Sequence, residues 1–221
     1  MTTISFTAKT CIVCRAEHEY TEIDSTMVFG SPDLDSRPPE MMRSTIFAWV
    51  QCCPACGYCA EDVSKAPKQA KVIVKSTQYQ AQLADPAMPE LANHFLCQAM
   101  IHEHAGDYAA AAWAIVHAAR VCDDEEKSES AKTCRIRAAN TVLRAIAAGQ
   151  EFTEQRGAET VILADLLRRA GAFAEARTII ARRRPGITDS TILRLLAFQD
   201  SLIARGDVAR HTLDEAMGED E

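Results

Sequence analysis

The chain has 221 residues, of which 48% are hydrophobic, 25% are charged and 6% are aromatic, and its formal net charge is −7. It has no apolar run of about 20 residues, the length that a bilayer-spanning helix needs, so we expect no membrane span. Abundant alanine and few aromatic residues favour closely packed helices over a core rich in strands.

The first residues and the cysteine count predict the cellular compartment of the protein. Residues 1–10 lack the basic stretch and the following apolar stretch of a secretory signal. The nine cysteines are an odd number, and a secreted disulfide scaffold would be a shorter chain. We therefore expect a cytoplasmic protein with reduced thiols.

Residues 1–63 are predicted to form a small β segment. Residues 4–7, 19–28 and 45–51 are strand candidates, because they alternate in polarity or are rich in threonine, isoleucine, valine and aromatic residues. Residues 30–40 contain a glycine and three prolines, which predicts an irregular loop.

Two Cys-x-x-Cys turns in this segment indicate a metal site. Cys11 and Cys14 form the first pair, and Cys53 and Cys56 form the second. Four thiolates complete a tetrahedral shell at about 2.3 Å from one ion and leave no open position for catalysis. We therefore predict a structural Zn2+ ion that folds residues 15–52 back on themselves.

The second turn is the more specific one, although its register has an alternative. A proline pre-sets its backbone and Gly57 can take a positive φ angle, whereas Arg15 follows the first turn. Cys56-x-x-Cys59 is another possible pair, but we expect Cys52 and Cys59 to be small, half-buried residues. The alternative for the whole set is free or redox-active thiols.

The irregular loop supplies the candidate contact for a ligand or partner. Asp33, Asp35 and Arg37 place two carboxylates and a guanidinium within five residues. The alternative, which we favour, is an internally paired loop that pins the β segment.

From residue 64 onward, apolar residues recur at i, i+3 and i+4, which predicts a series of helices. The expected helices span residues 65–84, 91–105, 107–122, 126–148, 157–170, 172–183, 191–205 and 207–217, and the acidic tail 218–221 is expected to fray. Asp107, Asp189 or Ser190, and Asp207 are the expected N-caps.

The helical part contains an internal similarity. Gly106, Gly171 and Gly206 each follow a predicted helix, and an aromatic residue or valine comes two positions later. Gly171 and Gly206 are 35 residues apart, close to the ~34-residue repeat of tetratricopeptide proteins. We therefore predict a tetratricopeptide-like array over residues 64–217. It is irregular, because the 65 residues from Gly106 to Gly171 are just short of two repeats but contain three predicted helices.

Other polar side chains of the helices have a functional and a structural interpretation. A second metal site could form from His94, Cys97, His102, His104 and His117, but packing or capping between alanine-rich helices is favoured. Arg168 and Arg169 are expected to complement the dipole at a helix C-terminus.

The charge distribution disfavours nucleic-acid binding. Residues 1–63 hold four basic and nine acidic side chains, a net charge of −5, and a Zn2+ ion with four thiolates adds −2. Nucleic-acid binding needs lysine and arginine opposite phosphates.

Two runs, from Phe29 to Glu40 and from Trp49 to Ala60, resemble an uncharacterised bacterial family of unknown function, and residues 166–176 are similar to it as well. The resemblance implies a zinc-ribbon-like N-terminal segment joined to a tetratricopeptide-like tail. It maps Cys11, Cys14, Cys53 and Cys56 onto the paired cysteines. This chain has Arg15 where the family usually has glycine, and the resemblance implies no activity.

The expected function is a non-enzymatic, zinc-binding interaction or scaffold module, because helix-pair arrays form concave surfaces for peptides and proteins. The expected division is 1–63, 64–217 and the tail 218–221. The alternative is an enzyme or small-molecule sensor. Its cleft between the β segment and the helices would be lined by Asp33, Asp35, Arg37, His94 and His102.

Overall fold

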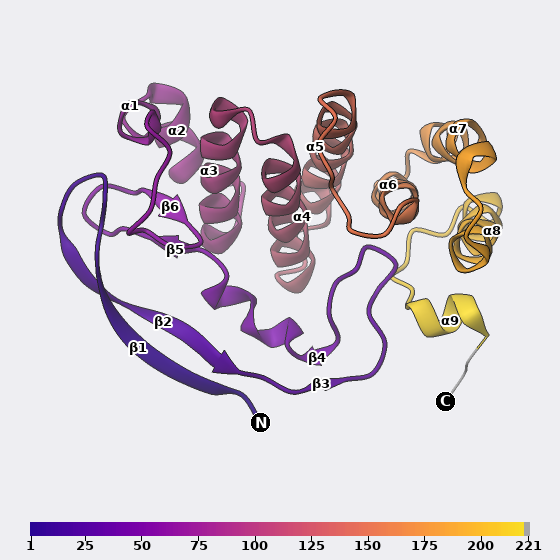
Figure 1. Cartoon of the computed structure of the whole chain (residues 1–221), viewed down its shortest axis with the longest axis horizontal. Helices are drawn as coiled ribbons and strands as arrows, with labels where there is room; N and C mark the ends of the chain where they lie inside the picture. The colour runs from indigo at the N-terminus through magenta and orange to yellow at the C-terminus, as the bar shows by residue number, and fades with distance from the viewer. Residues whose placement is uncertain (219–221) are drawn as a thin grey trace.

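The chain is mainly helical, with three antiparallel strand pairs before the helices (Figure 1). The computed structural model describes residues 1–218. The strands are β1 (Thr3–Thr10), β2 (Glu17–Ser25), β3 (Val28–Phe29), β4 (Glu40–Met41), β5 (Gln51–Cys52) and β6 (Cys59–Ala60), with the 3-10 helix η1 (Arg43–Ala48) between β4 and β5. The α-helices are α1 (Ala70–Val74), α2 (Thr77–Leu83), α3 (Glu90–Ala105), α4 (Tyr108–Asp124), α5 (Ser128–Ala147), α6 (Ala158–Arg169), α7 (Phe173–Arg183), α8 (Ser190–Ala204) and α9 (Leu213–Met217), and η2 (Arg184–Gly186) is a second 3-10 turn.

The helices stand in a row, and the N-terminal segment runs along one side of it (Figure 1). The strands pair as β1–β2, β3–β4 and β5–β6, and β6 lies against α3. The loop after β3 reaches across to α9, where Leu213 N–H donates to the carbonyl of Pro32 at 2.8 Å. The N-terminal segment therefore contacts both ends of the helical row.

Buried alanines let the central helices pack closely. Alanine occupies five buried positions on α4, and α4 packs against α3 on one side and α5 on the other. Small side chains let helix axes approach, as the low aromatic content predicts. The buried apolar residues of the β segment and of the helices form one cluster.

The three predicted glycine turns share one geometry. Gly106, Gly171 and Gly206 have φ angles of 78°, 78° and 68°, which a residue with a side chain rarely adopts. After each glycine, the next N–H donates to the carbonyl five residues back, at 2.9–3.0 Å. This is the Schellman arrangement that ends a helix. A tetratricopeptide arrangement of the whole array stays a prediction, as do the domain boundaries.

Most predicted helices are confirmed, but the range 65–84 is divided. Ser76 separates α1 from α2, and its side chain accepts a hydrogen bond from Tyr79 N–H as an N-cap. Serine favours this role over a helix interior because its hydroxyl replaces a missing backbone acceptor. Asp107 and Asp189 cap α4 and α8 as predicted.

The prediction of a helix over residues 207–217 is wrong in its first half. Arg168 Nη1 donates to the carbonyls of Asp207 and Ala209, at 2.8 and 2.9 Å, and so removes these acceptors from a helix. Asp207 therefore caps no helix, and Thr212 caps α9 instead. Residues 219–221 of the predicted tail lie outside the described residues.

The predicted strand over residues 45–51 is mostly the 3-10 helix η1. Thr45 donates to the carbonyl of Met42 and accepts a hydrogen bond from the indole N–H of Trp49. These local bonds at three- and four-residue spacing override the strand propensity of the residues. Within residues 1–218, no helix combines the length and apolar character that a bilayer span requires.

One half-buried histidine, packed among aromatic rings, makes stability depend on pH. Burial lowers the pKa of His117 well below its usual value, and the Arg120 cation lowers it further. Arg120 donates to His117 Nδ1 at 3.1 Å, so the neutral ring carries its proton on Nε2. The folded chain therefore keeps His117 neutral below about pH 6.5, where the unfolded chain takes up a proton.

We predict that the contribution of His117 to the free energy of unfolding falls as the pH drops below about 6.5, because the unfolded state then binds one more proton at this site. The contribution of His117 is at most about 1.4 kcal/mol per pH unit. Urea unfolding between pH 6.5 and 5 should show a smaller slope for His117→Gln. His104→Gln, at an exposed histidine, is the control. Equal slopes for wild type and His117→Gln would contradict the prediction.

Candidate metal centre

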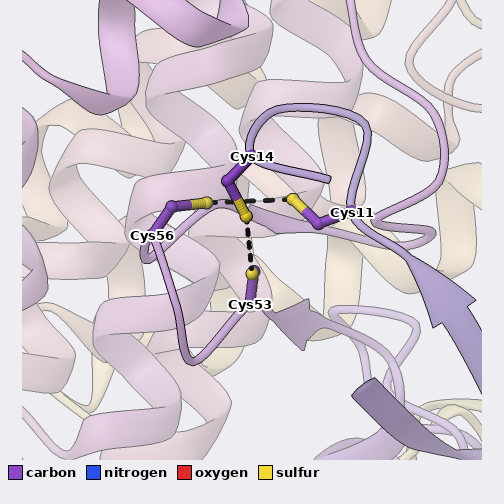
Figure 2. Close-up of side chains that lie close together, drawn as sticks. All are labelled: Cys11, Cys14, Cys53 and Cys56. Carbon is purple, nitrogen blue, oxygen red and sulfur yellow. Dashed lines mark hydrogen bonds between the residues drawn. The ribbon is translucent and has the colours of Figure 1, made fainter. Parts of the chain in front are cut away.

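The two Cys-x-x-Cys turns meet, although 39 residues separate Cys14 from Cys53. The first turn connects β1 to β2 at the end of their long hairpin, and the second connects β5 to β6. Figure 2 shows the four side chains pointing toward a common centre, with the Cys11–Cys56 and Cys14–Cys53 pairs crossing. Two hairpin ends thus supply two ligands each.

The sulfur positions suit tetrahedral coordination. All four sulfur atoms lie within 4.8 Å of one another, and the two crossed pairs are 3.8 and 3.6 Å apart. Four sulfurs at about 2.3 Å from a central ion would be about 3.8 Å apart. A disulfide needs about 2.05 Å, and all nine cysteines are free. These four cysteines therefore form a group that could hold a metal ion.

The backbone of the two turns is alike despite the different residues that follow them. Gly57 has a φ angle of 76° and Arg15 one of 70°, and each N–H donates to the carbonyl of the first cysteine of its turn. The N–H groups of Ala16 and Tyr58 donate to the sulfurs of Cys14 and Cys56. Arg15 thus adopts the left-handed conformation of glycine, at an energetic cost that glycine avoids.

The thiols do not ionise alike in the absence of a cation. The hydrogen bond from Ala16 N–H lowers the pKa of the Cys14 thiol. Burial raises the pKa of the Cys11 and Cys56 thiols. A divalent cation would offset the cost of burying these thiolates, so its binding should release protons.

The centre joins the β segment to the first helices. Ile12 N–H donates to the carbonyl of Val63 at 2.9 Å. Tyr79 of α2 is fully buried; its hydroxyl accepts from Cys59 N–H and donates to the Gly57 carbonyl. A Cβ atom on Gly57 would lie 2.4 Å from a methyl group of Leu83. The second turn is therefore seated directly against α2.

Cys52 and Cys59 lie outside this group of four. They face each other across β5 and β6, on the side of α3 that carries His94 and Cys97. Cys52 is half-buried and Cys59 is fully buried. The hydrogen bond with Cys59 and the nearby His94 lower the pKa of Cys52 to about 6. The pairing that uses Cys53 and Cys56 is therefore the one that the geometry supports.

The histidines do not assemble into a second centre. Within residues 1–218, the four-cysteine group is the one set of three or more potential ligands close enough to share an ion. His117 packs against the rings of Trp49, Phe95 and Trp113, with ring centroids 5.0 to 6.1 Å apart. His102 lies near Asp107, and His104 hydrogen-bonds the carbonyl of Met100.

The residues of the predicted contact loop are all buried and paired within the protein. Asp35 is 2% exposed and lies 3.4 Å from Arg120 Nε and 3.8 Å from Arg169 Nη1. Asp33 pairs with Arg43 at 2.7 Å, and Arg37 pairs with Asp124 of α4. Burial opposes the ionisation of Asp35, but the two arginines outweigh it and lower the pKa of its carboxyl. These contacts are those of the internally paired loop, the favoured alternative in the sequence.

Arg120 and Arg169 are the ion-pair partners of Asp35 that the sequence interpretation missed. Arg120 is 2% exposed, and Arg169 points into the protein toward Asp35 and Asp123 instead of complementing a helix end. Arg168 is fully buried and pairs with Asp165. A signal did exist, because Arg120 is the one Asp, Glu, Lys or Arg residue in the run 108–122, which is otherwise apolar except for Tyr108 and His117. A lone charge in such a run indicates a buried ion pair.

A cavity of about 350 Å3 lies where the β segment meets α3. Tyr58, Asp62, Gln98 and His102 are among the residues that line it. The alternative hypothesis expected a cleft lined by five residues, and of these only His102 lines this cavity. Its other expected residues, including the buried Asp35, lie elsewhere.

Comparison with known protein families, with curated proteins and with solved structures finds no match to this chain. The family resemblance and a bacterial origin therefore stay predictions, and the geometry of the chain itself carries the functional argument.

We predict that Cys53→Ser abolishes metal binding, because it removes one of the four ligands. Elemental analysis should find one metal ion per wild-type chain and close to none in the variant. The free energy of unfolding should fall by several kcal/mol, since metal binding couples to folding. Cys134→Ser, at a buried thiol on α5, should keep the ion. A wild-type chain without metal would refute the site.

A second prediction concerns the loop. Asp35→Ala should lower the free energy of unfolding by about 3–5 kcal/mol, because it leaves two arginines facing a buried site without their carboxylate. Asp200→Ala is the matched control. Its exposed pair with Arg184 should contribute less than about 1 kcal/mol. Chemical denaturation of both variants measures the difference, and equal losses would show that Asp35 is not a buried anchor.

Proposed function

We propose that this chain is a non-enzymatic protein-interaction module in which a Zn2+ ion clamps the N-terminal segment onto the helices. A set of four thiolates with sulfurs 3.6–3.8 Å apart in crossed pairs suits zinc better than calcium or magnesium, which prefer oxygen ligands. Four protein ligands close the coordination shell, so the ion supports the fold and offers no open position to a substrate.

The observation that carries the proposal is the exposed apolar surface of the N-terminal segment. Of the twelve large hydrophobic side chains exposed in residues 1–218, nine belong to residues 1–47. They are Met1, Ile4, Phe6, Met27, Val28, Phe29, Met41, Met42 and Phe47. Exposed apolar side chains that form a patch are typical of protein interaction sites, and we propose that these side chains supply one. We call these nine side chains the apolar surface.

The outward face of the β1–β2 hairpin carries two large apolar side chains near the open end of the hairpin, with two glutamates farther along the same face. Phe6 is 62% exposed and Ile4 is 45% exposed. The opposite face of the hairpin holds Tyr20, which is 8% exposed, and Lys9, which reaches Asp62 at 3.4 Å. An ordinary surface hairpin turns polar side chains to water. The two exposed apolar side chains favour a partner protein that covers this part of the outer face.

The net charge supports a protein or peptide partner over a nucleic acid. Residues 1–63 carry −5 before any metal is bound, and a tetrathiolate zinc centre makes the segment more negative. Phosphate groups would be repelled from this surface. A cytoplasmic location, where thiols stay reduced, is part of the proposal.

We predict that Phe6→Ser and Phe29→Ser each reduce recovery of the main partner in affinity purification from the native cell by at least about fivefold, since exposed aromatic side chains often carry binding energy. Val208→Ser, at a residue 49% exposed on the far part of the chain, should leave recovery unchanged. The Phe variants should keep their metal content and unfolding midpoint. Equal recovery by all four proteins would contradict the role of the apolar surface.

A further inference from the structure

Three adjoining cavities follow the junction between the β segment and helices α3 and α4. Their volumes are about 350, 490 and 570 Å3. Glu61 lines all three, Gln98 is shared by the first two, and Trp49 is shared by the last two. The shared walls make one groove, which we call the junction groove. Met42, a member of the apolar surface, lines the second and third cavities.

Gln98 gives this groove an unsatisfied acceptor. Its side chain on α3 is 4% exposed, and Oε1 is buried without a hydrogen-bond partner among the described residues. A buried amide oxygen left without a hydrogen-bond donor destabilises the protein. A ligand that brings an N–H group between the first two cavities would remove that destabilisation.

The charged side chains that line the groove are mostly carboxylates, which favours a ligand with a positive charge. Carboxylates line the groove at Glu22, Asp24, Glu61 and Asp62, against one lysine, Lys65. Glu22 and Asp62 are already paired with Lys9. Glu61 is exposed at the centre of the groove and has no ion-pair partner within residues 1–218. A lysine or arginine side chain of a partner would complement it.

The second of the three cavities, about 490 Å3 in volume, has an apolar wall close to Glu61. Trp49 and Trp113, the two tryptophans of the chain, both line it together with His117. Their indole N–H groups are engaged, by Thr45 and by the carbonyl of Phe152, so the rings present apolar surface. The neutral His117 adds no positive charge that would repel a basic ligand.

We propose that the junction groove binds a peptide segment in which a lysine or arginine lies next to a large apolar residue. The basic group lies between Glu61 and Gln98 Oε1, and the apolar side chain packs in the second cavity, against the wall that Trp49, His117 and Trp113 line. The inference rests on the proposed interaction function and names the chemistry of the partner. A groove formed by three joined cavities suits an extended segment better than a single small molecule.

A displayed library of random peptides, selected on the metal-loaded full-length protein, tests the proposal. We expect enriched sequences to combine lysine or arginine with a neighbouring leucine, methionine or aromatic residue. A synthetic peptide of the enriched sequence should change the tryptophan emission of the protein on titration, because both tryptophans line the cavity. Absence of enrichment, or enrichment of acidic sequences, overturns the proposal.

The variants separate specific binding from general charge attraction. Glu61→Gln should weaken the peptide at least about tenfold, and Gln98→Met should weaken it as well. Glu17→Gln removes the same charge at an exposed residue outside the groove and should leave affinity unchanged. Equal affinities of the Glu61→Gln and Glu17→Gln proteins would refute the site.

The same variants distinguish the groove from the wider proposal. If Glu61→Gln protein recovers the cellular partner as well as wild type does, the groove is refuted while the interaction function stands. If Phe6→Ser and Glu61→Gln proteins both recover it fully, the interaction function fails too.

Discussion

The convergence of four sulfur atoms from two hairpin ends is the constraint on which the rest of this structure depends. It ties the β1–β2 hairpin to the β5–β6 turn, and Tyr79 and Leu83 then seat that turn against α2. A two-stranded hairpin is marginally stable by itself, and residues 1–63 have few buried apolar side chains of their own. A metal ion bound by the four cysteines would supply the missing free energy, because metal binding couples to folding.

Buried ion pairs hold the N-terminal segment at a second place, the loop at Asp35. The loop at Asp35 is buried against Arg120 and Arg169, so its geometry depends on charge pairing in a region of low dielectric. Breaking such a pair is costly even where forming it contributes little net stability. The pair therefore specifies where the loop lies. Between the two anchors, residues 38–52 form one wall of the junction groove.

A site with four thiolate ligands has no open coordination position, so specific recognition by this chain must come from its protein surface. The thiolate centre and the buried loop keep η1 and β5–β6 in place, so that Trp49 and Glu61 face the helices that carry Trp113 and Gln98. The exposed apolar side chains of β1, Ile4 and Phe6, do not line this groove and add a separate apolar area. Recognition in this proposal comes from the surface, while the metal and the ion pairs supply rigidity.

The sequence by itself determined the features that depend on local spacing. The two Cys-x-x-Cys turns, the helix ends at Gly106, Gly171 and Gly206, and the N-caps at Asp107 and Asp189 follow from residue type at fixed offsets. Only the tertiary structure decided the features that depend on distant partners. Arg168 holds residues 207–209 out of a helix, Arg120 and Arg169 bury the Asp35 loop, and Glu61, Gln98 and both tryptophans meet in one groove. Periodicity and propensity describe neighbours along the chain, whereas ion pairs and cavities arise between segments far apart in it.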